Sequence, residues 1–247
     1  MTTRKDVERL TGATRDLTER AKDYLDQLVR SWDLTRPEVV RDLLLEVVPT
    51  LVEQYGDVAA VAAAEWYEET RAAQVEGAFA ARPTTRVIPR EQVQSSVRAL
   101  AGGLWDGELD KTLSLISGAV GRYISYMARD TVARNVERDP ARPRFARVPR
   151  GAKTCAWCLM LASRGWVYHS KKSAGEIAEH YHDECDCAVV PEWDRENAHV
   201  GGYDPDKLFA MYEEAHESGD TLSDTAKRLR RLFPDRVKDG VVEQTAA

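Results

Sequence analysis

The chain of 247 residues has only four cysteines and no excess of positive charge. Lys and Arg number 35 against 41 for Asp and Glu, which gives a formal net charge of -6 at pH 7. This balance argues against a protein coated in positive charge for nucleic acid, so any DNA contact has to be local. With 43% hydrophobic and 31% charged residues, the composition excludes a wholly disordered, collagen-like or disulfide-scaffold protein.

Long hydrophobic runs are absent. The longest weakly charged stretch, residues 58–64, consists of seven Val and Ala residues, far short of the roughly 18 to 20 that a membrane span needs. Residues 1–10 also lack the apolar core, about 7 to 15 residues long, of a secretory signal. We therefore expect no membrane insertion and a protein that is made and kept in the cytoplasm. In that reducing compartment, cysteines are more often metal ligands, redox centres or buried thiols than disulfides.

Several motifs that carry catalysis or nucleotide binding are missing. The sequence has no phosphate loop of the G-x-x-x-x-G-K-[ST] type, no dinucleotide loop G-x-G-x-x-G, no G-x-S-x-G elbow and no H-E-x-x-H pair. These absences argue weakly against an enzyme, and we expect neither catalysis nor a small-molecule substrate.

Apolar residues recur at helical spacing through the first half of the chain. The pattern predicts one helix over residues 3–32 and a second from residue 37, which Pro49 either kinks or restarts. The Ala-rich run 50–73 predicts a tightly packed helix, and residues 77–90 a loop. A further helix is predicted over residues 107–137. Its apolar seam, which we expect to be a buried face or an oligomer contact, comprises Leu113, Ile116, Val120, Tyr123 and Met127.

The composition of the sequence changes after residue 139, where several prolines interrupt helical periodicity and predict an extended segment. Strands are predicted over 166–169 and 188–190, around two short helical pieces. Two helices should close the chain, one opened by Asp204-Pro205 and one capped by Thr221 or Ser223. The predicted fold class is mainly α with a small α+β C-terminal module. The predicted regions are a helical N-terminal region 1–82, a linker with long helices 83–140 that pack on the next module, a Cys/His module 141–196, C-terminal helices 197–233 and a flexible tail 234–247.

All four cysteines lie between positions 155 and 187. They form a Cys155-x-x-Cys158 hook and, with a histidine, the sequence His182-x-x-Cys185-x-Cys187. The two cysteines of such a hook can coordinate one cation from a tight turn, and a second pair of ligands completes its tetrahedral coordination. Zinc is therefore the expected metal. Five candidates compete for four places: either His182 and Cys185 join the first pair, or Cys185 and Cys187 do. The abundance of thiols favours a structural zinc site over a catalytic one.

Three other interpretations of this cluster stay open. C-x-x-C also marks thioredoxin-like redox sites, although no βαβ pattern precedes it here. Nucleophilic Cys-His catalysis is disfavoured because Asp183, Glu184 and Asp186 interleave with the second cluster, and neighbouring carboxylates raise the pKa of a thiol. Lastly, the thiols can be buried without any ligand, as free cysteines often are.

A run of basic residues leads into the first cysteine without an intervening acid. These residues could contact the phosphates of DNA, or they could form a solvated edge strand whose charge prevents mispairing. The run comprises Arg142, Arg144, Arg147, Arg150 and Lys153.

Three stretches together resemble one known family. They read VPRGAKTCAWCLMLASRGWVYHS (148–170), HDECDC (182–187) followed by VVPEW, and YGDVAAVAAAEWYEE (55–69). They are similar to the MuF-like minor capsid, or head morphogenesis, proteins of tailed phages, with the actinobacteriophage branch fitting best, over roughly residues 37 to 195. The family's C-x-x-C falls on Cys155 and Cys158, and its H-x-x-C-x-C on His182, Cys185 and Cys187. Members often carry Pro after that histidine, where this chain has Asp183.

The resemblance implies a component of the virion, inside the capsid, that is assembled in the host cytoplasm. It implies portal, capsid and scaffold proteins as partners, with region 1–82 docking to portal or capsid, packaged DNA as a further contact, and a role in procapsid assembly or early DNA ejection. It implies no established catalysis. Some relatives are labelled capsid maturation proteases, and an alternative is a protease acting on scaffold or coat protein through Ser163 with His169 or His182.

Overall fold

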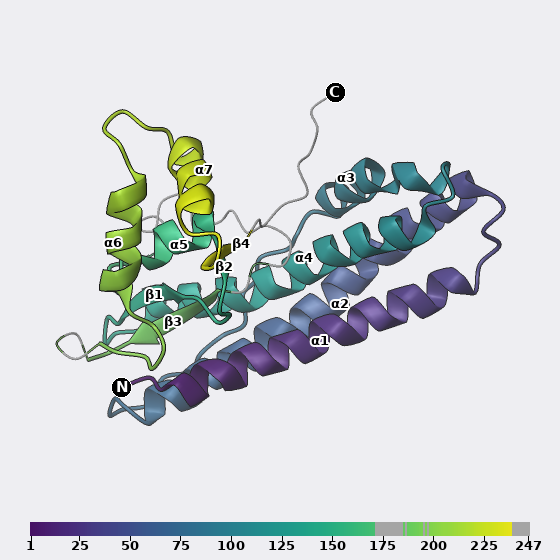
Figure 1. Cartoon of the computed structure of the whole chain (residues 1–247). Coiled ribbons are helices and arrows are strands. Elements are labelled where there is room, and N and C mark those ends of the chain that lie inside the picture. The colour runs from purple at the N-terminus through teal and green to yellow at the C-terminus, as the bar shows by residue number, and fades with distance from the viewer. Residues whose placement is uncertain (171–184, 186, 195, 197, 239–247) are drawn as a thin grey trace. The chain divides into compact units, whose positions relative to one another are not determined.

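The structure, a computed structural model, describes residues 1–170, 185, 187–194, 196 and 198–238. These residues form a mostly helical chain with two small two-stranded sheets (Figure 1), which confirms the expected mainly helical class with a small β component. The helices are α1 (Arg4–Arg30), α2 (Pro37–Ala72), α3 (Arg90–Leu100), the 3-10 helix η1 (Ala101–Leu104), α4 (Leu109–Arg138), α5 (Ala156–Ala162), α6 (Pro205–Ala215) and α7 (Leu222–Leu232). The strands are β1 (Arg144–Val148), β2 (Thr154–Cys155), β3 (Ala188–Glu192) and β4 (Val237–Lys238).

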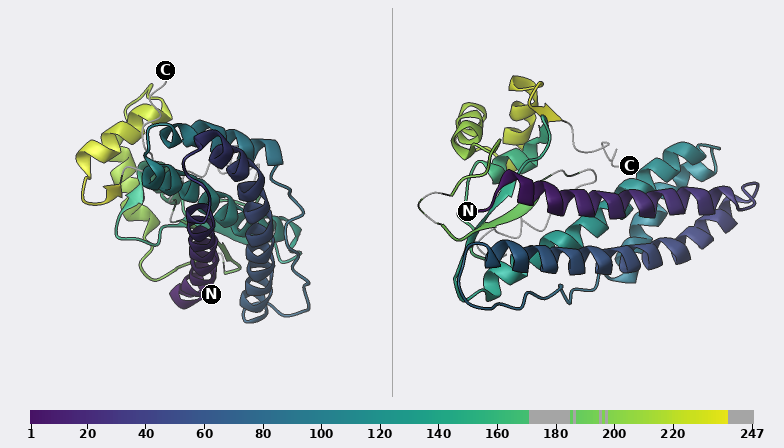
Figure 2. Two further views of the ribbon diagram at one scale, coloured as in Figure 1. Left: turned by 90° about the vertical axis from the view of Figure 1, so that its right-hand side faces the viewer. Right: turned by 90° about the horizontal axis from the view of Figure 1, so that it is seen from below.

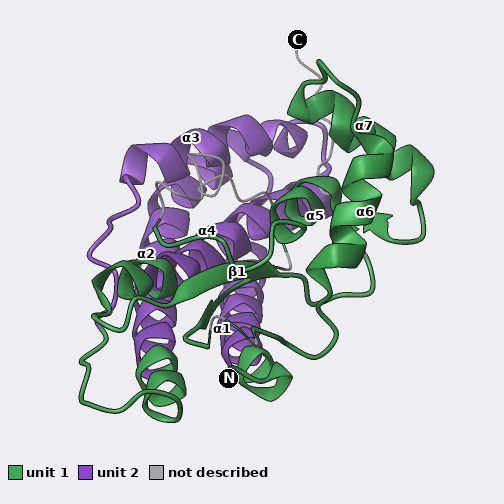
Figure 3. Ribbon diagram, turned by 90° about the vertical axis from the view of Figure 1, so that its left-hand side faces the viewer, with its two compact units in different colours: residues 1–9, 66–81, 132–247 green, residues 10–65, 82–131 purple. Residues whose placement is uncertain are grey.

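The chain divides into two compact units that do not follow chain order (Figure 3). Unit 1 comprises residues 1–9, 66–81 and 132–247, and unit 2 comprises residues 10–65 and 82–131. Helices α1, α2 and α4 each contribute residues to both units. The regions predicted from the sequence are consecutive stretches of chain, whereas these units are not. The two divisions differ because a long helix can pass from one packed cluster into another with no change in its amino-acid composition.

Unit 2 is a helical bundle in which α1 and α2 run antiparallel with α4 beside them (Figures 1 and 2). The predicted seam of α4 is buried, since all five of its residues are at most 6% exposed. Glycines permit close approach at two places. A Cβ on Gly56 of α2 would lie 3.1 Å from Met127 Cγ, and one on Gly121 of α4 would lie 2.9 Å from Thr18 Cγ2. The expected close packing around the Ala-rich run is thus achieved by small residues at helix contacts.

Helix α2 continues through Pro49. Proline has no backbone N–H, so the carbonyl of Leu45 loses its donor within the helix. The Gln94 side chain supplies one instead, because its Nε2 donates to the Leu45 carbonyl at 3.0 Å. Nearby, Arg90 donates to the carbonyl of Glu46 at 3.3 Å. Of the two outcomes expected at Pro49, a kink or a restart, the restart does not occur: α2 is continuous, and a side chain of α3 satisfies the carbonyl that proline leaves open.

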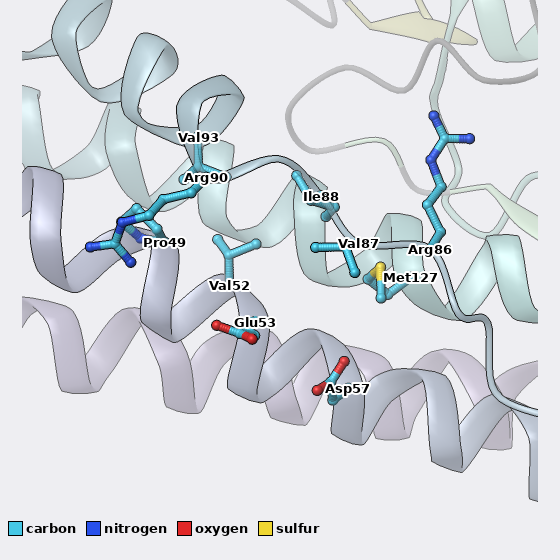
Figure 4. A pocket seen from close by; sticks show the side chains of 10 residues that line it. All are labelled: Pro49, Val52, Glu53, Asp57, Arg86, Val87, Ile88, Arg90, Val93 and Met127. Atoms are coloured by element: carbon cyan, nitrogen blue, oxygen red, sulfur yellow. The ribbon is translucent and has the colours of Figure 1, made fainter.

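Unit 2 also contains a cavity of about 280 Å³ beside α2, α4 and the segment leading into α3 (Figure 4). Val52, Val93 and Met127 give it apolar walls, and the carboxylates of Glu53 and Asp57 lie one helical turn apart on α2. Arg86 and Arg90 also line it, so charges of both signs meet there. No helix among the described residues is long and apolar enough to cross a membrane.

In unit 1, β1 and β3 pair antiparallel, with Phe145 opposite Pro191 and Val148 opposite Ala188. One face of this ribbon carries Ala146, Val148 and Val190 into a buried apolar cluster. The strand expected at 188–190 is confirmed as part of β3. The strand expected at 166–169 is reduced to a single bridge between Tyr168 and Phe145.

Helices α5, α6 and α7 enclose a second apolar cluster of unit 1, which includes Leu159 and Leu229. The predicted caps are confirmed: Asp204 accepts from the N–H of Lys207 ahead of α6, and Thr221 forms a reciprocal capping box with Asp224 at the start of α7. The region 234–247 was expected to be a flexible tail. Its first residues instead form β4, which pairs in parallel with β2, because Val237 is buried against the helices; residues 239–247 lie outside the described part.

A buried carboxylate holds together three distant segments of unit 1. Asp139 Oδ2 accepts hydrogen bonds from Tyr67 Oη at 3.0 Å, Arg71 Nε at 2.9 Å and Trp193 Nε1 at 3.0 Å. Its Oδ1 accepts from the backbone N–H of Ala141 at 2.9 Å. Burial, followed by the charge of Asp139, raises the pKa of Tyr67, so this phenol remains a donor. The side chains of Arg71 and Asp139 are 5% and 0% exposed, so this ion pair is screened little by water.

We predict that Asp139→Asn lowers the free energy of unfolding by about 3 to 5 kcal/mol, because it leaves the buried Arg71 guanidinium without its counter-charge. Urea unfolding followed by circular dichroism measures this change. Asp110→Asn, which alters an exposed ion pair, is the control and should shift stability by no more than about 1 kcal/mol. Equal effects of the two substitutions would contradict the assignment of Asp139 as a buried charge hub.

Candidate metal centre

The sheet of unit 1 brings together two segments that lie about forty residues apart. Strand β3 begins at Ala188, directly after Cys187, and β1 ends at Val148, directly after Arg147. Because Val148 pairs with Ala188 and Arg147 with Val189, the register places Arg147 beside Cys187. Side chains alternate between the two faces of a strand, so Arg147 and Phe145 point away from the apolar cluster that Ala146 and Val148 enter.

Three cysteine sulfurs meet at this point. Cys158 Sγ lies 3.2 Å from Cys185 Sγ and 3.5 Å from Cys187 Sγ, and the last two are 3.3 Å apart. All three residues are buried, at 0%, 8% and 1% exposure respectively. Sequence reasoning gave all three as metal-ligand candidates, and the structure gathers them into one group that could hold a metal ion. We call Cys158, Cys185 and Cys187 the sulfur triad.

Cys155 belongs to the same buried cluster but has a second role. It is the N-cap of α5, where its Sγ accepts the backbone N–H of Cys158 at 3.2 Å. The bond holds this sulfur at the start of α5, beside the sulfur triad. The other candidate for a fourth ligand, His182, lies outside the described residues.

Arg147 reaches into the sulfur triad with its guanidinium. Its Nη2 lies 2.7 Å from Cys187 Sγ, 3.6 Å from Cys158 Sγ and 3.8 Å from Cys185 Sγ, and its Nε lies 3.2 Å from Cys187 Sγ. The residue is 1% exposed. A single cationic group therefore donates to all three sulfurs from a buried position.

The environment acts on the thiol pKa values in opposite directions. Hydrogen bonding with Cys155 and then with Cys185 raises the pKa of Cys158, and burial raises the pKa of Cys187. The Arg147 guanidinium lowers both, although the raising effects are larger. Neutral thiols are thus favoured in the absence of a divalent cation, and binding such a cation would have to displace their protons.

The donor set suits a soft or borderline cation. Thiolate ligands favour zinc, whereas magnesium and calcium prefer oxygen ligands. With Zn–S bonds of about 2.3 Å, the sulfurs of a tetrahedral centre stand about 3.8 Å apart. The sulfurs of the triad are within about 0.6 Å of that separation, so small side-chain shifts would allow all three to coordinate one ion. Cys158, Cys185 and Cys187 would then hold the metal, with the fourth ligand from Cys155 or His182.

Charge balance gives Arg147 a physical role at such a centre. A divalent cation with three thiolates has a net charge of -1, and with four thiolates it has -2. Burying net charge is costly unless it is compensated. The guanidinium is always protonated and stands at hydrogen-bond distance from the sulfurs, so it removes one unit of that negative charge.

The basic run does not form one continuous surface. Arg147 is buried against sulfur, so its assignment as a phosphate contact is wrong. Lys153 donates to the Pro234 carbonyl at 2.9 Å. Arg142 and Arg144 line a cavity of about 450 Å³ together with Glu137 and Asp139, whereas Arg150 lines a different cavity of unit 1. The edge-strand alternative also fails for Arg147, because its side chain is not solvated.

The serine of the protease alternative has a local structural role. Ser163 is the C-cap residue of α5, and its Oγ donates to the carbonyl of Met160 at 2.9 Å. The residue is 7% exposed, whereas His169 is exposed.

Two functional side chains escaped sequence reasoning. In the sequence, Asp139 marks only the position after which the composition changes, and Arg147 is only one of several charges in a basic run. Arg147 is the one charged residue between Phe145 and Val148, and strand periodicity places it on the same face as Phe145. That position in an apolar segment could have indicated that its side chain is buried.

Fold and site together define a mainly helical protein with a small cysteine-bearing αβ unit. The model of the VG15 protein family matches residues 1–215, so the chain belongs to the VG15 protein family, a family with bacteriophage members. It is 34% identical over 110 residues to the "Gene 15 protein" of Mycobacterium phage D29, covering 32% of this chain and 40% of that protein. It is 32% identical over 123 residues to the "Gene 15 protein" of Mycobacterium phage L5, covering 34% and 42%. The chain thus spans about 40% of the length of these curated relatives. No solved structure matches it.

We predict that Cys158→Ser and Cys187→Ser each abolish stoichiometric zinc binding and lower the melting temperature by at least about 5 °C. Elemental analysis of the purified protein and thermal unfolding with and without a chelator measure these effects. Cys155→Ser and His182→Ala, compared side by side, identify the fourth ligand as the one whose loss releases zinc. A wild-type protein that contains no metal and melts at the same temperature with a chelator would disprove the zinc centre.

We predict that Arg147→Met weakens binding of Co²⁺, used as a spectroscopic substitute for zinc, by at least about tenfold, because the charge beside the sulfurs is lost. Arg147→Lys should fall between Met and wild type, since it keeps the charge without the planar donor fork. The sulfur-to-cobalt absorption band measures affinity and thiolate number. Arg144→Met, on the other face of β1, is the control, and wild-type affinity in Arg147→Met would refute the charge-compensating role.

Proposed function

We propose that this protein is a structural component of the phage head: a MuF-like minor capsid protein that associates with the portal inside the capsid and acts in procapsid assembly or early DNA ejection. The observation that carries the structural role is the burial of the sulfur triad. Each sulfur of the triad belongs to a residue at most 8% exposed, whereas a catalytic metal needs an open position for water or substrate. A metal bound there would stabilise the fold of the small αβ part of unit 1, as structural zinc does.

Two further lines of support give the phage setting. The chain belongs to a family with mycobacteriophage members. The segments that resemble MuF-like proteins include the residues of the sulfur triad, so the resemblance and the candidate metal centre rest on the same part of the chain. The proposed partners are portal, capsid and scaffold proteins, with the helical N-terminal region as the docking element.

We propose no catalysis. The protease alternative requires an activated serine, and Ser163 is instead buried at the end of α5 with its hydroxyl donating to a backbone carbonyl. No observation on the described residues favours that alternative, so it is left to experiment.

Quantitative mass spectrometry of purified mature particles and of procapsids from the phage that encodes this chain tests the proposal. We expect a few intact copies per particle, on the scale of portal rather than coat protein, in both preparations. Presence in procapsids with loss from mature particles would favour a transient assembly role or a protease. Absence from both would refute the head assignment.

A further inference from the structure

The cavity beside α2 combines carboxylates with an apolar lining (Figure 4). All the residues that line it belong to unit 2. Its volume of about 280 Å³ lies just below the range of about 300 to 1,000 Å³ that is typical of sites for drug-sized ligands. A single side chain or a small chain molecule is therefore the size of occupant that fits. We call this cavity the α2 cavity.

The acids of the α2 cavity are Glu53 and Asp57, which lie four residues apart and so share one side of α2. Among the residues that the structure describes, neither carboxylate has a hydrogen bond or an ion pair. Helix α2 supplies no counter-charge of its own nearby, because residues 42–70 contain no Lys, Arg or His. Like charges at this spacing repel each other, so a cation held by both carboxylates would relieve that repulsion.

Two arginines also line the α2 cavity, but each has a partner elsewhere. Arg90 pairs with the carboxylate of Glu46 and donates to the Glu46 carbonyl at 3.3 Å. The guanidinium of Arg86 lies 5.3 Å from the centre of the Tyr126 ring, and in Figure 4 it points away from both carboxylates. These arginines line the cavity without pairing with its acids.

The apolar part of the lining favours an organic cation over a metal ion. Val52 of α2, Val93 of α3 and Met127 of α4 are core residues, each at most 4% exposed. Val87, in the segment that leads into α3, is 77% exposed. An alkyl chain gains free energy by covering such apolar surface, whereas Mg²⁺ keeps a shell of water and oxygen ligands.

We propose that the α2 cavity binds a primary ammonium group at the end of an unbranched alkyl chain. Glu53 and Asp57 hold the ammonium group, and the apolar lining contacts the chain. A lysine side chain of a partner protein and a free polyamine share this chemistry. The net charge of -6 attracts such cations to the protein. This inference goes beyond the proposed function and uses no residue of the metal centre.

Nuclear magnetic resonance of the full chain, titrated with n-alkylammonium ions from methylammonium to pentylammonium, tests the proposal. We expect amide signals of residues 49–57, 86–93 and 127 to shift. Affinity should rise with chain length, by up to about fourfold for each methylene that becomes buried. The double variant Glu53→Gln/Asp57→Asn should bind pentylammonium at least about fivefold more weakly, because two ion pairs are lost. Melting curves check that this variant is folded.

The control is Asp23→Asn/Glu65→Gln, which removes two charges from exposed residues of unit 2 that do not line the cavity. Its affinity for pentylammonium should stay within about twofold of wild type. Equal losses in the two double variants, or equal affinities for methylammonium and pentylammonium, would mean diffuse attraction and would overturn the site. So would undetectable binding of pentylammonium by the wild type, or tighter binding of Mg²⁺ that shifts the same signals.

Two further probes distinguish the sources of the ligand. Binding of Nα-acetyl-lysine amide as tight as that of pentylammonium would support a lysine side chain of a partner protein. Much tighter binding of spermidine, weakened in Glu53→Gln/Asp57→Asn but not in the control, would support a free polyamine. Particle composition tests the proposed function separately, and either result can fail without the other.

Discussion

The buried guanidinium of Arg147 places a strong constraint on the residues around it. A charge that cannot be neutralised at any physiological pH has been placed among sulfur atoms at 1% exposure. That arrangement is stable only if electron-rich partners approach it, which the sulfur triad does at 2.7 to 3.8 Å. The β1–β3 register, the position of Cys187 just before β3 and the hook at the start of α5 all serve to bring those partners in.

Among the described residues of unit 1, Arg71 and Arg147 are both buried, and their partners differ. Arg71 pairs with a carboxylate, Asp139, which also accepts hydrogen bonds from Tyr67 of α2 and from Trp193, after β3. Arg147 has thiols, whose charge depends on whether a cation takes their protons. The Arg71–Asp139 pair supports the fold without a metal, and the Arg147 centre would couple the fold to metal supply if the sulfur triad binds a cation.

Much of this arrangement could be predicted from the sequence, and the failures have physical causes. Helix periodicity located α1, α2 and α4 well, and cap chemistry located α6 and α7, because both signals are local. The cysteine spacing identified the triad as ligand candidates. It could not show that Cys158, Cys185 and Cys187 would converge while Cys155 caps a helix, since that depends on the β1–β3 register. Arg147 was predicted as a phosphate contact because the charge of a basic run does not indicate which face of the strand each side chain occupies. The continuity of α2 through Pro49 depended on Gln94, which lies far along the chain.

The parallel pairing of β2 with β4 sets an order of events during synthesis. Thr154 pairs with Val237 and Cys155 with Lys238, so the strand that leads into the cysteine hook finds its partner more than eighty residues later. During translation the hook and the triad are made before this partner strand, so β2 stays unpaired until residues 237–238 have been made. Contacts between such distant residues form slowly because a long loop must close first. All of unit 2 lies before residue 132, so the nascent chain can pack its helical bundle before the cysteine-bearing part gains the β2–β4 pair.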